Sequence, residues 1–179
     1  MRFLLILTLL MVGAPVARAE VNLFAGPSVM AAVNDNNAAA LTSALMGGAN
    51  PNTKTVGGRT VLIEAVSKDR YDMARILLDK RADANRADDL GNTALHYASD
   101  STSPEMISLL LGHGARLDIP NRQGLTPLML AAKAGRADLA EVLLEAGADP
   151  KRLDFTGRSA AEWAADGRDR VTKQLFSER

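Results

Sequence analysis

An internal repeat with a period of 33 residues constrains this chain more than any other feature. Four glycines, Gly58, Gly91, Gly124 and Gly157, follow one another at this spacing. The same register holds Thr60, Thr93, Thr126 and Ser159, the leucine pairs that begin at Leu77, Leu110 and Leu143, and the alanines Ala49, Ala82, Ala115 and Ala148. An uninterrupted period of this length is typical of a solenoid, in which each unit stacks on the next because it cannot bury its apolar side chains alone.

Each unit predicts a pair of short helices, and the segment "GLTPLMLAAKAGRADLAEVLLEAGADP" shows this best. Thr126 is a good N-cap residue, and Pro127 favours the first position of the helix that follows. Gly135 interrupts this helix, and apolar residues at i, i+3 and i+4 within 139–143 indicate a second one. The two helices must be antiparallel, and a turn-rich connection leads to the next unit.

These residues resemble the ankyrin repeat, including its Gly-x-Thr-Pro-Leu-His-x-Ala-Ala and Leu-Leu-x-x-Gly-Ala-Asp elements. The resemblance covers roughly residues 22–179 and is weaker in 55–87, where Val61 and Ile63 replace the Pro and the His. It implies an all-α, ankyrin-type helical solenoid of about five units with hairpin-like connecting loops. The predicted units of this single domain, residues 20–179, are about 22–54 as N-terminal cap, 55–87, 88–120, 121–153, and 154–179 as C-terminal cap.

Packing within the stack can be predicted from equivalent positions. Met73, Met106 and Leu139 should line up between units, followed by Ile76, Leu109 and Val142. In the C-terminal cap, we expect Val171, Leu175 and Phe176 to face inwards. Polar residues such as Arg170 and Lys173 should then keep the outer surface wettable.

The first nineteen residues have the pattern of a signal peptide. Arg2 precedes an apolar run at 3–12, and Ala17 and Ala19 supply small residues for cleavage after Ala19. The run of about ten residues is too short to span a bilayer, which needs roughly twenty. We therefore expect an exported bacterial protein in the periplasm, with secretion as the alternative and a retained N-terminal helix as the competing interpretation.

The charge balance argues against polyanionic partners. Without Arg2 and Arg18, 19 basic residues face 21 acidic ones, and no basic run occurs. This balance gives little support to nucleic acid or anionic membrane as partner. We expect another protein as the partner, no membrane insertion of the mature chain, and a monomer in isolation. The absence of cysteine is compatible with an oxidising compartment.

The two histidines, His96 and His113, are the first candidates for chemistry. Catalysis would need a nucleophile or an orienting acid, and zinc binding would need further His or Cys ligands, which the chain hardly offers. The resemblance instead implies that His96 hydrogen-bonds loop backbone, and His113 suits a helix C-terminus. "DANRADD" at 83–89 lacks the Gly and Glu of a calcium loop, and the repeated Asp-x-x-Gly sites at Asp88 and Asp154 are interpreted as turns. We predict no catalytic residue, no cofactor and no metal.

Function is therefore expected on a surface. The resemblance implies that the hairpin tips and the exposed side of each first helix form a concave face, and this step rests on fold analogy. Gly91, Thr93, His96, Gly124, Thr126 and Pro127 are predicted to be structural. The candidate contact residues are Arg59, Lys68, Asp89, Leu90, Asn92, Tyr97, Arg122, Gln123, Leu125, Lys133, Phe155, Arg158, Trp163 and Asp166. The aromatic residues among them could equally cover the core of their own unit.

The functional hypothesis is a non-catalytic module that binds a partner protein through this face in the periplasm. The resemblance implies support of an exported enzyme such as a catalase. An immunity protein that neutralises a toxin, and an effector secreted into a host cell, are the alternatives. An enzyme is the remaining alternative. It would be supported if the purified mature chain bound a metal stoichiometrically, or if His96→Ala abolished an activity without changing thermal stability.

Overall fold

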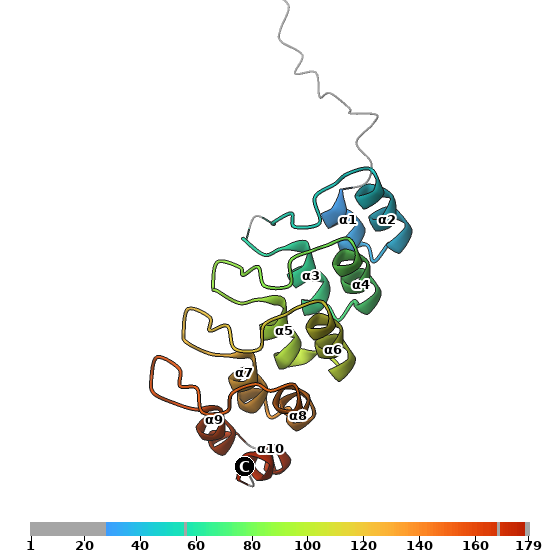
Figure 1. Ribbon diagram of the computed structural model, residues 1–179. Coiled ribbons are helices and arrows are strands. Elements are labelled where there is room, and N and C mark those ends of the chain that lie inside the picture. Colours follow the sequence, from blue (N-terminus) through green and yellow to red (C-terminus); the bar gives the residue numbers. More distant parts are fainter. Residues whose placement is uncertain (1–27, 56, 168, 178–179) are drawn as a thin grey trace, which may run out of the picture.

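The computed structural model describes residues 28–55, 57–167 and 169–177, which form a stack of helix pairs (Figure 1). Each predicted unit contains one pair, so the all-α solenoid is confirmed. The predicted signal peptide, its cleavage site and Val56 lie outside the described residues. The described helices are α1 (Val29–Asn34), α2 (Ala38–Met46), α3 (Val61–Ser67), α4 (Tyr71–Asp79), α5 (Ala94–Ser101), α6 (Pro104–Gly112), α7 (Pro127–Ala134), α8 (Ala137–Glu145), α9 (Ala160–Asp166) and α10 (Arg170–Ser177).

Helix boundaries follow the local chemistry of the repeat. The Thr126 hydroxyl accepts a hydrogen bond from the backbone N–H of Met129 at 3.4 Å, and Pro127 is the first residue of α7. This arrangement satisfies one of the N–H groups that a helix leaves free at its start. Gly135 caps the C-terminus of α7 with a φ of 71°, a left-handed conformation that favours glycine. The predicted start and interruption of this helix are both confirmed.

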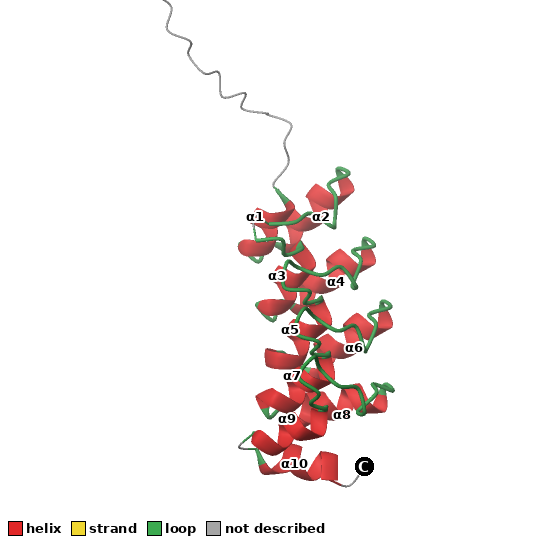
Figure 2. Ribbon diagram, turned by 90° about the vertical axis from the view of Figure 1, so that its left-hand side faces the viewer, coloured by secondary structure: helices red, strands yellow, loops and turns green. Residues whose placement is uncertain are grey.

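The helices form two layers, and each layer is continuous along the stack. The odd-numbered helices α1, α3, α5, α7 and α9 each pack on the next, and the even-numbered helices do the same (Figures 1 and 2). The core lies between the layers, where Met73, Met106 and Leu139 are at most 2% exposed. The residues one turn further on, at 76, 109 and 142, are partly buried against that core. The predicted alignment of apolar positions is therefore confirmed.

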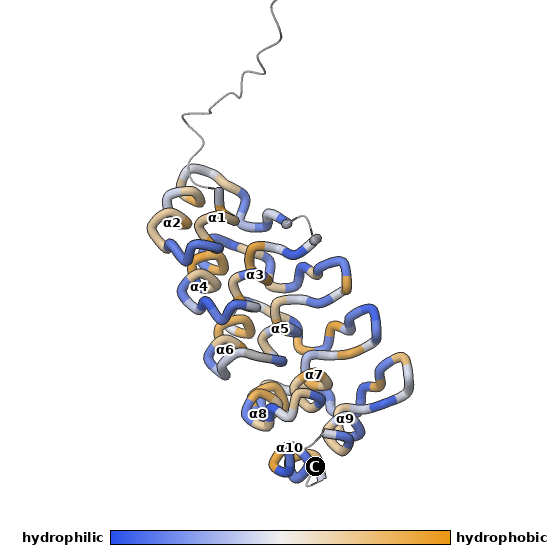
Figure 3. Tube along the Cα trace, turned by 180° about the vertical axis from the view of Figure 1, so that it is seen from behind, coloured by the Kyte–Doolittle hydropathy of each residue, from blue (hydrophilic) through white to orange (hydrophobic). Residues whose placement is uncertain are grey.

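Four hairpin-like loops project from the odd-numbered helices to one side of the stack (Figure 1, left). Figure 3 shows that these loops are largely hydrophilic, whereas apolar residues concentrate in the helices. Neighbouring loops are joined by their backbones. The N–H of Arg122 donates to the carbonyl of Leu90 at 3.0 Å, and the N–H of Phe155 donates to that of Gln123 at 3.3 Å. The loops are consequently hydrogen-bonded to one another along one side of the stack.

The C-terminal cap corrects one prediction. Val171 is 64% exposed, whereas Thr172 is 1% exposed and Leu175 and Phe176 are partly buried against the core. The carboxylate of Asp169 accepts hydrogen bonds from the Thr172 N–H and hydroxyl, at 2.6 and 2.7 Å. Positions i, i+3 and i+4 of a helix share a face, so an inward residue 172 places 175 and 176 inward and turns 171 outward. Within the described part of the chain, no helix is both long enough and apolar enough to cross a membrane.

Candidate functional site

In the loops before α5, α7 and α9, one polar side chain holds the tip. In the loop before α5, the Asp88 carboxylate accepts hydrogen bonds from the N–H groups of Leu90 and Asn92, both at 2.9 Å. Asn121 and Asp154 accept the equivalent pairs of N–H groups in the next two loops, at distances between 2.8 and 3.0 Å. The Asp-x-x-Gly sites are therefore turn chemistry, as predicted, and they hold the tips in a common geometry.

His96 is part of the scaffold beneath these tips. Its side chain is 1% exposed, and Nδ1 lies 3.1 Å from the backbone N of Thr93. On the other side of the ring, Nε2 lies 3.1 Å from the carbonyl oxygen of Leu125 in the following loop. Burial lowers the pKa of His96, because the charged imidazolium would be desolvated. The predicted hydrogen bonding to loop backbone is confirmed, and it joins two successive units.

The same position carries different chemistry in the next two units. The sulfur of Met129 lies 3.4 Å from the backbone N of Thr126, and the carboxylate of Glu162 accepts from the backbone N–H of Ser159 at 2.6 Å. Each of the three side chains accepts a hydrogen bond at the start of its helix, as in a capping box. An imidazole, a thioether and a carboxylate occupy this position in successive units. The position therefore requires a hydrogen-bond acceptor and not one particular catalytic group.

A row of half-buried side chains runs along the odd-numbered helices. Tyr97 on α5, Leu130 on α7 and Trp163 on α9 repeat at the 33-residue spacing, and all three pack partly against the core. The Tyr97 hydroxyl donates to Asp88 at 2.7 Å, and the guanidinium of Arg59 lies 4.8 Å from the centre of its ring. Burial, followed by the hydrogen bond to Asp88, raises the pKa of Tyr97. Tyr97 and Leu130 line one hollow in the surface and Trp163 lines a second, so we call this row the floor of the predicted concave face.

Trp163 contacts three charged side chains. Its indole N–H donates to Asp154 at 3.0 Å, while Arg158 and Lys133 lie 4.0 and 4.7 Å from the ring centre. Burial opposes ionisation of Asp154, but hydrogen bonds from Thr156, the Arg158 backbone and the Trp163 indole outweigh it and lower the pKa to about 2. Arg158 is in turn ion-paired with the carboxylate of Asp166. The carboxylate of Asp154 is therefore ionised at neutral pH and fully engaged inside the protein.

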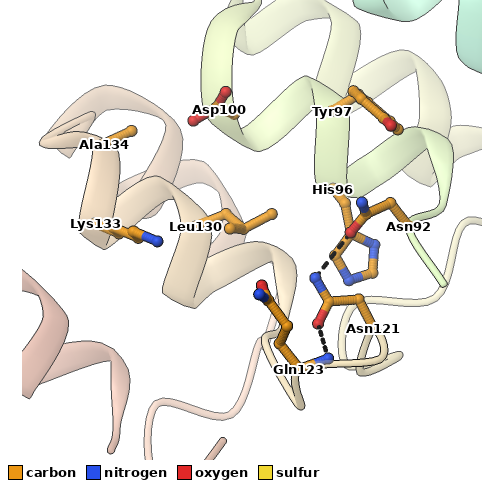
Figure 4. A pocket seen from close by; sticks show the side chains of 9 residues that line it. All are labelled: Asn92, His96, Tyr97, Asp100, Asn121, Gln123, Leu130, Lys133 and Ala134. Carbon is orange, nitrogen blue, oxygen red and sulfur yellow. Dashed lines mark hydrogen bonds between the residues drawn. The ribbon is translucent and has the colours of Figure 1, made fainter. Parts of the chain in front are cut away.

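Two adjacent hollows open on this floor. The first has a volume of about 410 Å³ and lies between α5 and α7 (Figure 4). The second has a volume of about 380 Å³ and extends towards α9. Gln123 and Lys133 line both hollows, so the two adjoin. The first is lined by Asn92, His96, Tyr97, Asp100, Asn121, Gln123, Leu130, Lys133 and Ala134, and the second by Arg122, Gln123, Leu125, Lys133, Asp154, Phe155, Thr156 and Trp163.

Comparison with known proteins agrees with this geometry. A family model described as ankyrin repeats in three copies matches residues 29–121, and a second, described as ankyrin repeats in many copies, matches residues 109–164. The chain belongs to the ankyrin repeat family. Ankyrin repeats imply a protein–protein interaction module.

Curated relatives share the repeats over short stretches of their own length. The neurogenic locus notch homolog protein 1 of Danio rerio is 36% identical over 136 residues, which are 75% of this chain and 6% of the relative. The protein of the same name from Mus musculus is 38% identical over 109 residues, 60% of this chain and 4% of the relative. A fem-1 homolog A-like protein from Mus musculus is 35% identical over 99 residues, 55% of this chain and 15% of the relative. The similarity thus concerns the ankyrin repeats and not these whole proteins.

Most of the predicted contact residues lie around the two hollows of the ankyrin stack. Leu90 and Phe155 are 62% and 75% exposed at the loop tips. Arg59 lines a separate hollow near the N-terminal end, together with Glu64. Lys68 lies in the same part of the stack, where its ammonium pairs with Glu64 at 2.7 Å. The structure therefore divides the predicted set into a C-terminal group around the two hollows and a smaller N-terminal group.

Leu125 is a correction, because it is only 3% exposed and cannot act as a tip contact. The Asn121 carboxamide accepts from the Leu125 N–H at 3.0 Å, and the Leu125 carbonyl faces His96. Both backbone groups of Leu125 are thus hydrogen-bonded. Its side chain is part of the core of the ankyrin stack. Asp154, which the sequence marked only as a turn residue, lines the second hollow, and Asn121, at the equivalent position one repeat earlier, lines the first. Their place in the register, just before the exposed tip residues, was the available signal.

Proposed function

We propose that this ankyrin repeat chain is a non-catalytic module that binds a partner protein through its concave face, at the two adjoining hollows between α5 and α9. The observation that carries the proposal is that these hollows share Gln123 and Lys133 and lie beside Phe155, whose side chain is 75% exposed. Aromatic residues and arginine are enriched at protein interfaces, and the second hollow is lined by Phe155, Trp163 and Arg122.

A differential capture experiment tests this face. Full-length protein carrying Leu90→Ser and Phe155→Ser loses two exposed apolar side chains from the loop tips. The matched control, Met46→Ser with Val171→Ser, loses two exposed apolar side chains from α2 and α10. We expect the control to retain the partner captured by the wild-type chain and the tip variant to lose it. Equal recovery by both folded variants would show that the concave face is not the binding surface.

The proposal extends to the periplasm on the pattern of residues 1–19 alone. In this compartment the partner would be an exported enzyme such as a catalase, with a toxin or a host target as the competing assignments. N-terminal sequencing of the chain from a periplasmic extract should begin at Glu20. The genes beside this one distinguish the three kinds of partner.

A further inference from the structure

The second hollow carries two cations that the protein itself does not neutralise. Lys133 on α7 and Arg122 in the loop before α7 are both exposed, and both line this hollow. Among the described residues, no carboxylate forms an ion pair with either side chain. The ammonium of Lys133 lies over the ring of Trp163, 4.7 Å from its centre, which leaves ammonium protons directed away from the ring.

The acidic groups nearby are already committed. Asp154 also lines this hollow, but its two oxygens accept hydrogen bonds from Thr156, the Arg158 backbone and the Trp163 indole. The exposed acid Asp166 pairs with Arg158. Asp154 keeps its negative charge but is only 6% exposed, so the charged groups that the second hollow exposes to solvent are Arg122 and Lys133.

The N-terminal hollow of the same stack is different. There, Glu64 lies within ion-pair distance of both Arg59 and Lys68, at 4.0 and 2.7 Å. Glu64 therefore compensates Arg59 within the chain, whereas Lys54, which lines the same hollow, donates to the backbone carbonyl of Ala87 at 3.5 Å. Asp100 lines the first hollow and does not line the second. In the second hollow, the unpaired positive charge lies on α7, at Lys133, and in the loop that precedes α7, at Arg122.

Apolar surface lies directly beside these cations. Phe155 and Trp163 line the same hollow, and the Phe155 ring lies against the backbone of Gly124 on one side and is exposed on the other. A carboxylate gains charge-assisted hydrogen bonds from guanidinium and ammonium groups. A neighbouring apolar side chain gains by covering an exposed aromatic ring.

We propose that the second hollow recognises an acidic peptide segment of the partner, in which an Asp or Glu carboxylate lies next to a bulky apolar side chain. The carboxylate binds Arg122 and Lys133, and the apolar side chain lies on Phe155 and Trp163. The Gln123 amide, at the border of the two hollows, faces the backbone of the segment. This inference rests on the proposed function and specifies the chemistry of the partner.

A displayed library of random dodecapeptides, selected on the full-length protein, tests the inference without presupposing a partner. We expect enriched peptides to carry Asp or Glu within two residues of a large apolar side chain. A fluorescein-labelled peptide of that sequence should bind the Arg122→Gln, Lys133→Met variant about tenfold more weakly, as measured by fluorescence anisotropy. Its affinity should also fall as salt is added.

The matched control removes two exposed cations from the other layer, as Arg75→Gln with Lys80→Met on and just after α4. This variant has the same change in net charge and should bind the peptide as the wild type does. Enrichment of neutral or basic peptides, no enrichment, or equal loss in both variants would overturn the inference. Tighter binding of a phosphoserine version than of the glutamate version would assign the hollow to phosphate instead.

Failure here is distinguishable from failure of the proposed function. If the Leu90→Ser, Phe155→Ser variant loses the captured partner while no acidic peptide is enriched, the concave face binds a partner of other chemistry. If that variant and its control retain the partner equally, the face itself is wrong, whatever the peptides show.

Discussion

His96, Met129 and Glu162 occupy one position in three successive repeats, and each accepts a hydrogen bond from the backbone N–H of its N-cap residue. Only His96 also reaches the following unit, where its second ring nitrogen faces the carbonyl of Leu125. An imidazole has two nitrogen atoms on opposite sides, so one side chain can accept at a helix start and donate to a neighbouring loop. The residue that first suggested chemistry joins two repeats.

His96→Met tests this role with a residue that the chain itself uses at this position. The helix start keeps an acceptor, but the carbonyl of Leu125 loses the imidazole and keeps only the N–H of Asn121, at 2.9 Å, as a donor. Loss of this one hydrogen bond should lower the free energy of unfolding by about 0.5 to 1.5 kcal/mol. Because burial lowers the pKa of His96 below 6.5, the unfolded chain takes up the proton more readily. Wild-type stability should therefore fall as the pH drops below 6.5, and this contribution should be absent from His96→Met. Urea unfolding at about pH 8 and about pH 5.5 checks both effects, and equal stability of the two proteins would contradict the assignment.

At the scale of elements, the hairpin loops support one another through close backbone contact. Gly124 has a φ of 81°, and a Cβ built there would lie 2.5 Å from the backbone N of Phe155 and 2.8 Å from its ring. Gly157, at the equivalent position in the last repeat, has a φ of 85° and nothing within 4 Å of such a Cβ. The repeated glycine thus permits the left-handed backbone at each of these positions. Where another loop stacks upon it, the glycine also leaves the space that this loop occupies.

Substituting alanine at each glycine separates these two purposes. In both Gly124→Ala and Gly157→Ala, the free energy of unfolding should fall by about 1 to 2 kcal/mol, because the left-handed backbone conformation is unfavourable for alanine. In Gly124→Ala, the free energy of unfolding should fall by about 1 to 3 kcal/mol more, since the added methyl group displaces the loop that carries Phe155. Chemical unfolding of the two variants gives the comparison directly. Losses of equal size would mean that the loops do not depend on this contact.

At the scale of the whole molecule, each unit is stabilised by its neighbours. α6 packs on both α4 and α8, whereas α2 has an even-numbered neighbour on one side only among the described helices. In a solenoid of this kind, the stability of a region depends on its intrinsic stability and on the interfaces beside it. A substitution in the middle of the stack should therefore act over more of the chain than one near its start.

Leu110→Ala and Leu41→Ala compare these positions, because both side chains are completely buried. Each should cost about 2 to 5 kcal/mol locally, the usual penalty for truncating a buried leucine. We expect Leu110→Ala to lower hydrogen-exchange protection in the units on both sides of α6, and Leu41→Ala to lower it mainly in residues 28–54. Hydrogen exchange with mass spectrometry resolves the two patterns. An identical, uniform loss in both variants would indicate a single cooperative unit instead of coupled repeats.

Much of the fold could be predicted from residues that act within one turn of helix or one loop. The cap at Thr126, the helix stop at Gly135 and the turn at Asp88 each depend on partners no more than four residues away. The 33-residue register then repeats these local structures, which determines a solenoid without any knowledge of how the units are rotated. The resemblance likewise implied that His96 hydrogen-bonds loop backbone, but its contact with Leu125 in the following repeat depends on how the repeats stack.

Only the tertiary structure decided which side chains are exposed on the surface. Leu90 and Leu125 are both apolar residues near loop tips, yet one is 62% exposed and the other 3% exposed. Lys133 contacts Trp163 in the next repeat, and Val171 turns outward because Thr172 is held inward. These outcomes depend on the rotation between neighbouring units and on the direction of each side chain, which a pattern within one repeat does not specify. The sequence by itself therefore determined the repeat and its scaffold, and packing between repeats decided which side chains a partner can reach.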